Sequence, residues 1–293
     1  MWQKLYKIFR SSFGVISVIT LIVLWSAISY FGISYGKEFF SNITSNDYAD
    51  TSETGSSSDM ENCNVLGINL HGQLLTYIPI DTGDSLIKDT DLVSSDTVLY
   101  YINQAEKDDE IKAILVEVDS YGGSPVAGEE VSIAIKTSTK PTVGLIRQAG
   151  ISAAYLAISS AGRIFASKNS DVGGIGVTQS YLDNVSKNQK EGYNFVQLNA
   201  GKYKDIGNPD KPLTEEERVL LIRDLNIVYQ NFIKDVSVNR GIPLEDVKKI
   251  ADGSSVMGET AKALHLIDEI GSITEVEKYL SEKIGEEVEI CWN

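Results

Sequence analysis

One serine lies between a strand-like run and a helix-like run in the middle of the chain. Ser152 follows Gly150 by two positions in IRQAGISAAYLAISS, residues 146–160, and heads a series of small and apolar residues. At a strand-to-helix junction, the positive end of the helix dipole favours negative charge on a serine oxygen. The same position is also that of an ordinary helix N-cap. This segment alone leaves both interpretations open, a nucleophile and a cap.

A serine needs a neighbouring base to act as a nucleophile. The chain has two histidines, His71 beside the first strand-like run and His265 in AKALHLIDE, which disfavours a Ser-His-Asp triad. Lysine is the other option, provided that burial lowers the pKa of its ammonium group. Lys202 and Lys204 lie in NAGKYKDIGNP, after a strand-like run. In an extended segment both would point to the same side, so the local sequence does not separate them.

A glycine pair is the third candidate feature. Gly122 and Gly123 end the segment DSYGG, which directly follows the apolar run AILVEV. Glycines at a strand end allow positive φ and close approach of the backbone to a ligand. Their amides could converge on one oxygen and form an oxyanion hole. A simple tight turn into the following helix is the alternative.

These residues are carried by alternating strand and helix patterns. Strand-like runs occupy residues 65–70, 111–120, 141–146, 163–167, 172–177 and 195–200. Helical spacing follows at 96–110, after Ser124-Pro125, and after Ser152. Such alternation predicts an α/β domain with a largely parallel sheet.

The C-terminal part of the chain is richer in helical patterns. LTEEERVLLIRDLNIVYQNFIKDVSVNRG opens with a capping box, Thr214 to Glu217, and predicts a long helix that stops at Gly241. A second helix, LEDVKKIAD, the segment TAKALHLIDEIGS, and a final helix and strand follow. We expect one domain over residues 63–293.

The first 62 residues have a different composition. Residues 11–36 carry no charged side chain, and Lys4, Lys7 and Arg10 precede them. About 20 apolar residues span a bilayer, and positive charges mark the cytoplasmic side. The pattern predicts a cytoplasmic segment 1–10, a transmembrane anchor 11–36, a flexible linker 37–62 and an extracytoplasmic domain. The protein would then be a single-pass protein of the cell membrane, with a long cleaved signal as the alternative.

Composition excludes some classes of function. The net charge is −15, from 26 basic and 41 acidic residues, which argues against nucleic acid as a partner. Cys63 and Cys291 form no CxxC motif or Cys/His cluster, so we expect no metal site and no cofactor. Outside the cytoplasm the two cysteines could form a disulfide, and buried thiols are equally compatible with the sequence.

The order of these segments resembles the signal peptide peptidase A family of membrane-anchored serine peptidases. The matching pieces run over about residues 63–281: DSYGG, SAAY, GGIGV, GKYKDIGNP, the LTEEE helix, and IADG with GETAKALHLIDEIG. The resemblance implies a Clp/crotonase-like α/β domain with stacked ββα units. It also implies that Ser152 is the nucleophile, that Lys204 is the general base, and that Gly122 and Gly123 form the oxyanion hole.

The resemblance further implies an endopeptidase with a Ser-Lys dyad that degrades released signal peptides or other membrane-derived peptides. It implies a ring-like homo-oligomer in which the serine and the lysine can come from neighbouring subunits. The chain departs from the family at Tyr121, where proline is usual, and at Ala153-Ala154, where two glycines are usual. A catalytically inactive scaffold in a membrane assembly is the alternative function. An acyl-CoA enzyme of the crotonase type is disfavoured by the predicted anchor.

Overall fold

The computed structural model describes residues 63–78 and 91–293, which belong to one compact unit. The predicted cytoplasmic segment, anchor and linker, residues 1–62, lie outside the described residues. Within the described ranges, no helix is both long enough and apolar enough to cross a bilayer.

Among the described residues, nine strands form one sheet around a path in the order β2-β1-β3-β4-β5-β8, with β6 beside β4, β7 beside β6, and β9 beside β1. Every strand pair is parallel except β6 with β7. The predicted α/β class with a largely parallel sheet is therefore confirmed. The strands are β1 (Val65–Leu75), β2 (Leu92–Ser94), β3 (Ala113–Gly123), β4 (Thr142–Ile151), β5 (Arg163–Ala166), β6 (Asp171–Gly173), β7 (Ser255–Met257), β8 (Glu269–Ile270) and β9 (Ile290–Trp292).

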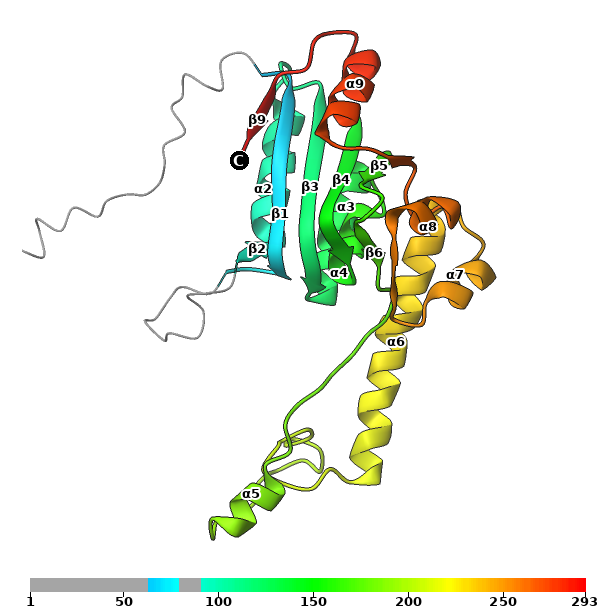
Figure 1. Ribbon diagram of the computed structural model, residues 1–293. Coiled ribbons are helices and arrows are strands. Elements are labelled where there is room, and N and C mark those ends of the chain that lie inside the picture. The colour runs from blue at the N-terminus through cyan, green and yellow to red at the C-terminus, as the bar shows by residue number, and fades with distance from the viewer. Residues whose placement is uncertain (1–62, 79–90) are drawn as a thin grey trace, which may run out of the picture. The chain divides into compact units, whose positions relative to one another are not determined.

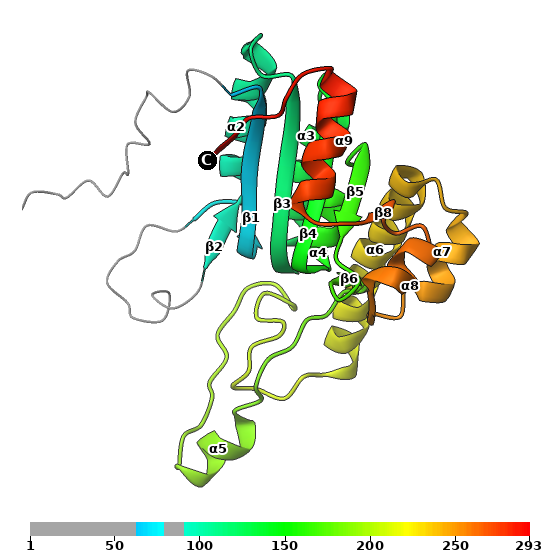
Figure 2. The same ribbon diagram turned by 45° about the horizontal axis from the view of Figure 1, so that its top comes forward.

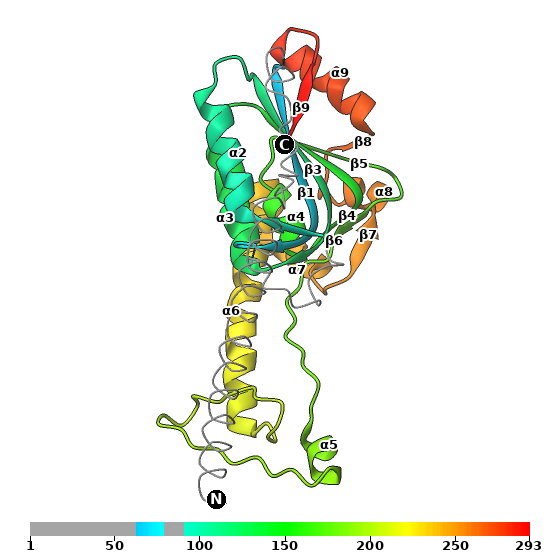
Figure 3. The same cartoon turned by 90° about the vertical axis from the view of Figure 1, so that its left-hand side faces the viewer.

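Helices cover both faces of this sheet, which explains why its central strands are apolar throughout. Helices α2 (Ser95–Lys107), α3 (Pro125–Thr137) and α4 (Ala153–Ile158) lie on one face, and α9 (Ile273–Ile284) lies on the other (Figures 1 and 3). Alternate residues of β3 pack into two hydrophobic clusters, one on each face of the sheet. Val116 and Val118 pack in the larger cluster with α2, α3 and α4, whereas Ala113 and Leu115 pack with Val276 of α9.

The long predicted helix is confirmed as α6 (Glu215–Arg240). Thr214 and Glu217 form the expected capping box, and Gly241 ends the helix in the left-handed conformation at φ 66°. Two short helices follow, α7 (Leu244–Ile250) and α8 (Gly258–Ala263). Figure 2 shows α7 and α8 beside α6, at the edge of the sheet that carries β8.

Residues 177–214, here called the arm, join the body of the domain to α6. The arm contains α5 (Val185–Lys190) and lies beside the N-terminal end of α6, beyond the end of the sheet (Figures 1 and 3). The strand predicted over residues 195–200 is wrong, because these residues lie in the arm without strand structure. Their apolar side chains suggested burial in a sheet, yet Leu198 is 93% exposed and no described strand pairs with this segment.

The two cysteines form a disulfide, Cys63–Cys291, with a Cα–Cα distance of 5.7 Å. It ties the start of the domain to β9, which pairs with β1 through Val65, Leu66 and Gly67. The structure thus decides between the two states that the sequence left open.

Candidate active site

Ser152 occupies a strained turn between β4 and α4. Its φ of 56° and ψ of −128° lie outside the regions that non-glycine residues favour, a conformation that costs on the order of 1–3 kcal/mol. The turn is held by hydrogen bonds from Ser152 N to Gly173 O at 2.8 Å and from Leu156 N to Ser152 O at 3.0 Å. Although Ser152 is at the N-cap position, its side chain makes no capping hydrogen bond. A strained strand-to-helix turn that presents a serine is typical of nucleophiles.

The glycine pair packs directly against this turn. Gly122 has φ 101°, and a Cβ atom added there would lie 2.8 Å from Ser152 Cβ and 2.9 Å from Ile151 O. Gly128 brings α3 equally close, since a Cβ there would lie 2.6 Å from Ala153 O. The predicted nucleophile and the predicted oxyanion-hole residues therefore lie together.

The amide N–H groups of Gly122 and Gly123 differ in their hydrogen bonding. Gly122 N donates a hydrogen bond to Ser120 Oγ at 3.1 Å, and Ser120 Oγ in turn donates to Gly72 O at 2.5 Å. Gly123 pairs with Leu74 in the parallel ladder, where the adjacent amide of Ser124 donates to Leu74 O at 2.8 Å. In a parallel ladder, a residue whose neighbours bond to the partner strand directs its own N–H away from that strand. The N–H of Gly123 therefore points away from β1. Gly123 N is therefore the better placed donor for an oxyanion.

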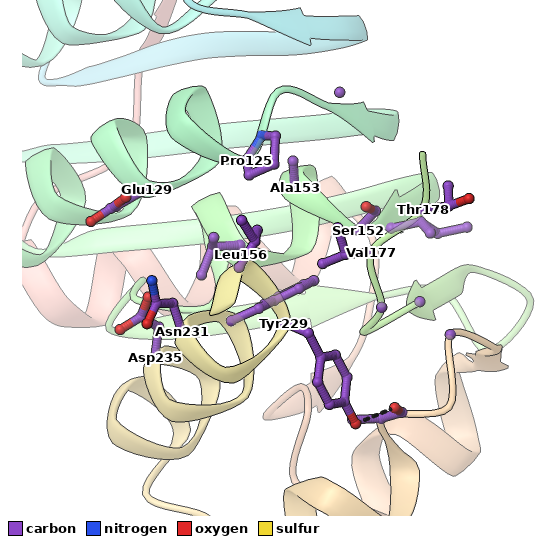
Figure 4. A pocket seen from close by; sticks show the side chains of 18 of the residues that line it. Pro125, Glu129, Ser152, Ala153, Leu156, Val177, Thr178, Tyr229, Asn231 and Asp235 are labelled. Atoms are coloured by element: carbon purple, nitrogen blue, oxygen red, sulfur yellow. Dashed lines mark hydrogen bonds between the residues drawn. The ribbon is translucent and has the colours of Figure 1, made fainter. Parts of the chain in front are cut away.

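A pocket of about 730 Å³ opens at Ser152. Its walls come from the glycine turn, α3, α4, the start of the arm, the middle of α6, and the turn after α7. Figure 4 shows Ser152 and Ala153 at one end, Leu156 in the middle, and Glu129, Asn231 and Asp235 at the other end. The hydroxyl of Ser152 makes no hydrogen bond with any described residue and so remains available to a ligand in this pocket.

Lys204 is not among the residues that line this pocket. It lies in the arm, two residues after Lys202, whose ammonium group pairs with Glu216 in the first turn of α6. The pocket meets α6 only from Val228 onward, about 18 Å further along the helix axis. Within one chain, no described contact joins Lys204 to Ser152.

The two candidate lysines have different contacts. The hydrogen bond to Glu216 raises the pKa of Lys202, and the Lys202 ammonium also lies 5.1 Å from the centre of the Tyr203 ring. A raised pKa keeps the amine protonated, so that less free amine is available to accept a proton near neutral pH. Lys204, in contrast, makes no side-chain hydrogen bond or ion pair within the part of the chain that the structure describes.

Neither histidine lines the pocket of Ser152. His71 Nε2 lies 3.2 Å from Glu117 Oε1, and the other oxygen of Glu117 accepts a hydrogen bond from Arg147 at 2.8 Å. His265 follows α8 with a positive φ of 61°. A Ser-His arrangement therefore receives no support from the described residues.

The comparisons with known proteins identify a peptidase family. Residues 134–287 match the model of Peptidase family S49, which is more than half of the chain. The chain belongs to peptidase family S49. The predicted resemblance to the signal peptide peptidase A family is thereby confirmed.

Two relatives illustrate the S49 membership. A protein of Methanocaldococcus jannaschii, named as a protease, is 37% identical over 188 residues, which cover 62% of this chain and 60% of that protein. A protein of Enterococcus faecium, named as signal peptide peptidase SppA, is 27% identical over 194 residues, which cover 65% of this chain and 56% of that protein. The chain thus spans somewhat more than half the length of these relatives. Among solved structures, a mutant of ClpP1 from Listeria monocytogenes gives a TM-score of 0.45 at 13% identity, covering 70% of this chain and 91% of that one.

The departures from the S49 pattern are structurally mild. Ala153 and Ala154 are buried in the first turn of α4, where helical backbone requires no glycine. Tyr121 is 64% exposed at the pocket, and its hydroxyl accepts a hydrogen bond from Gln148 Nε2 at 2.9 Å. Neither departure occupies the position of a reacting group.

Sequence reasoning missed Ser120 and Tyr155 as residues that support the site. Tyr155 is fully buried, and its hydroxyl donates to Leu266 O at 2.9 Å, which fixes α4 against the segment after α8. Burial raises the pKa of this phenol well above its ordinary value, so it stays protonated as a donor. Ser120 lies in the motif DSYGG and Tyr155 in the motif SAAY, and this position in the motifs could have pointed to both residues.

Proposed function

We propose that this S49 chain is a serine endopeptidase in which Ser152 attacks the peptide carbonyl. The observation that carries this proposal is the strained turn of Ser152, whose free hydroxyl faces a pocket beside the Gly122-Gly123 turn. Backbone strain at one non-glycine residue persists where the surroundings impose it, and such residues concentrate at active sites.

The chemical steps follow from the groups present. A lysine amine accepts the proton of Ser152 as Oγ forms a bond to the carbonyl carbon. The amide of Gly123 donates to the oxygen of the tetrahedral intermediate, while Ser120 holds Gly122 in position. The intermediate collapses to an acyl-enzyme, the lysine ammonium protonates the leaving amine, and water then releases the acyl group.

We propose that Lys204 is the base and that a second copy of the chain supplies it. Lys204 is unpaired among the described residues and remote from Ser152 of its own chain, whereas Lys202 is ion-paired. The arm that carries Lys204 exposes several large apolar side chains, among them Leu182, Tyr193, Val196 and Leu198. Exposed apolar side chains in such number are typical of surfaces that bind other chains. An oligomer that buries the arm would bring Lys204 to a neighbouring Ser152.

Mixed oligomers test this arrangement directly. Ser152→Ala and Lys204→Ala chains are each expected to be inactive alone. Unfolded together and refolded at equal amounts, they should recover about a quarter of wild-type activity, because a quarter of the sites then combine an intact serine with an intact neighbouring lysine. Lys202→Ala is the matched control. It should be active alone, and its mixture with Ser152→Ala should also be active. If Lys204→Ala is active alone, and Lys202→Ala is inactive alone but regains activity when mixed with Ser152→Ala, then Lys202 and not Lys204 is the base.

We also propose that the domain is held on the extracytoplasmic side of the membrane by residues 11–36 and acts on released signal peptides or other membrane-derived peptides. The Cys63–Cys291 disulfide supports this location, because such bonds persist outside the reducing cytoplasm. Alkylation of free thiols in intact cells before lysis should leave both cysteines unmodified. Complete alkylation of both would contradict the extracytoplasmic location.

A fluorophosphonate probe tests the alternative of an inactive scaffold. A probe that leaves Ser152 unlabelled in the assembled oligomer would favour that alternative.

A further inference from the structure

The pocket that opens at Ser152 has a strongly one-sided charge. Its lining includes three charged residues, and all three are acids: Glu129, Asp235 and Asp252. Glu129 projects from α3 and Asp235 from α6, and Figure 4 places both, with Asn231, at the end of the pocket away from Ser152. Two different helices thus contribute carboxylates to the same end of one cavity.

The stretch between Ser152 and these acids is apolar. Leu156 and Phe232 are each 5% exposed, and Val126 and Tyr229 complete the wall. Pro125 and Glu129 are separated by about 6 Å along the axis of α3, one turn of helix. An apolar stretch that ends in carboxylates suits a side chain with a long aliphatic stem and a cationic head.

Glu129 is exposed and Asp235 is half-buried, and both differ from the ion-paired acids of this domain. Glu117, Glu217 and Asp268 each have a basic partner within 2.8 Å. Neither Glu129 nor Asp235 makes a side-chain hydrogen bond or an ion pair within the described ranges.

Asp235 interacts electrostatically with two nearby lysines, but these lysines do not line the pocket. Burial raises the pKa of Asp235, and the charges of Lys136 and Lys234 act in the opposite direction. Lys136 donates a hydrogen bond to Asn239 at 3.1 Å, and neither lysine is among the lining residues. The carboxylate is therefore left to interact with whatever enters the pocket.

We propose that this pocket selects peptide substrates that place a lysine or arginine side chain next to the bond attacked by Ser152, with Asp235 and Glu129 binding the cationic head. The inference rests on the proposed peptidase function and specifies its substrate class. Apolar residues elsewhere in the peptide would occupy the rest of the cleft, which is compatible with membrane-derived peptides that combine basic and apolar residues.

The test compares two peptides that differ at one position, lysine against norleucine, which keeps the stem and removes the charge. The full-length oligomer should cleave the lysine peptide with a kcat/KM about tenfold or more above that of the norleucine peptide. The double substitution Asp235→Asn with Glu129→Gln should reduce this ratio at least tenfold. Asp235→Lys should shift the preference toward a glutamate peptide. Asp224→Asn, on the same helix outside the pocket, is the matched control and should leave the ratio unchanged.

Failure of this inference can be distinguished from failure of the peptidase proposal. Cleavage of both peptides with equal kcat/KM, or a ratio that survives the double substitution, would overturn the charge selection and leave the peptidase function standing. Binding of the same fluorescent peptides to Ser152→Ala is the second readout, measured by fluorescence anisotropy. Preferential binding of the lysine peptide that depends on Asp235, without any turnover by the wild type, would support the charge selection and overturn the peptidase function. Absence of both turnover and preferential binding would overturn both.

Discussion

The backbone of Ser152 predicts a conflict between stability and activity at one residue. Glycine adopts φ 56° and ψ −128° without strain, whereas alanine keeps the Cβ atom that causes it. We expect Ser152→Gly to be more stable than Ser152→Ala by about 1 kcal/mol, after the extra unfolded-state entropy of glycine is subtracted. Both variants should be inactive. Urea unfolding of the two proteins measures the difference, and equal stabilities would show that the turn is not strained.

At Gly122 the surroundings leave no space for a side chain. A methyl group there would meet Ser152 and Ile151 at under 3 Å, in a conformation of φ 101°. We expect Gly122→Ala to lower kcat/KM at least 100-fold and to destabilise the fold by about 2 kcal/mol or more. Gly241→Ala is the matched control, since Gly241 also has positive φ but no atom lies within 4 Å of an added Cβ. It should cost about 1 kcal/mol and leave activity intact.

At the scale of elements, the sequence predicts what short-range patterns determine. The apolar run of β3, the Ser124-Pro125 start of α3, and the Thr214–Glu217 capping box were all visible, because each depends on neighbours in the chain. The segment 195–200 failed for the opposite reason. Its apolar residues predict burial, but Phe195, Val196 and Leu198 are exposed in the described chain. The subunit interface that we propose for the arm would have the same local apolar pattern as a strand in a sheet.

The attachment of the arm to α6 is expected to depend on pH. Glu217 Oε1 accepts a hydrogen bond from Lys211 at 2.6 Å, and its other oxygen accepts one from Thr214 N at 3.1 Å. The bond from Lys211, followed by that from Thr214, lowers the pKa of Glu217 below its ordinary 4.5. A depressed pKa means that this stabilisation is complete above pH 4.5 and is lost as the pH falls through the lower folded value.

Glu217→Gln should therefore loosen the arm at neutral pH and remove part of this acid dependence. Hydrogen exchange of residues 199–214 should become faster, and activity should fall about tenfold if the arm positions Lys204. Glu215→Gln is the control, because Glu215 forms only an exposed pair with Arg218. An equal effect of both substitutions would show that the Lys211–Glu217 pair does not hold the arm.

At the scale of the whole molecule, the candidate site brings together Ser152, Gly122 and Gly123, whereas Lys204 does not line its pocket. Ser152, Gly122 and Gly123 could be predicted because they lie at the ends of adjacent parallel strands, which meet at one edge of a sheet. The acids of the pocket could not be predicted, because Glu129 and Asp235 come together only through the packing of α3, α4 and α6. The partner that we propose for Lys204 could not be predicted from local patterns either, because the proposal places it on another chain.

The disulfide closes the domain as a whole, because Cys63 and Cys291 are 228 positions apart in the sequence. Loss of such a long loop closure costs about 2–5 kcal/mol of unfolding free energy. We expect Cys63→Ser, Cys291→Ser and the double variant to lose the same amount, because each breaks the same bond. The three-residue strand β9 would then depend on its pairing with β1 and on Asn64, whose side chain bonds to Glu287 O and Glu289 N. Urea unfolding with and without reductant measures the loss. A double variant as stable as the oxidised wild type would show that the non-covalent contacts of β9 close the domain alone.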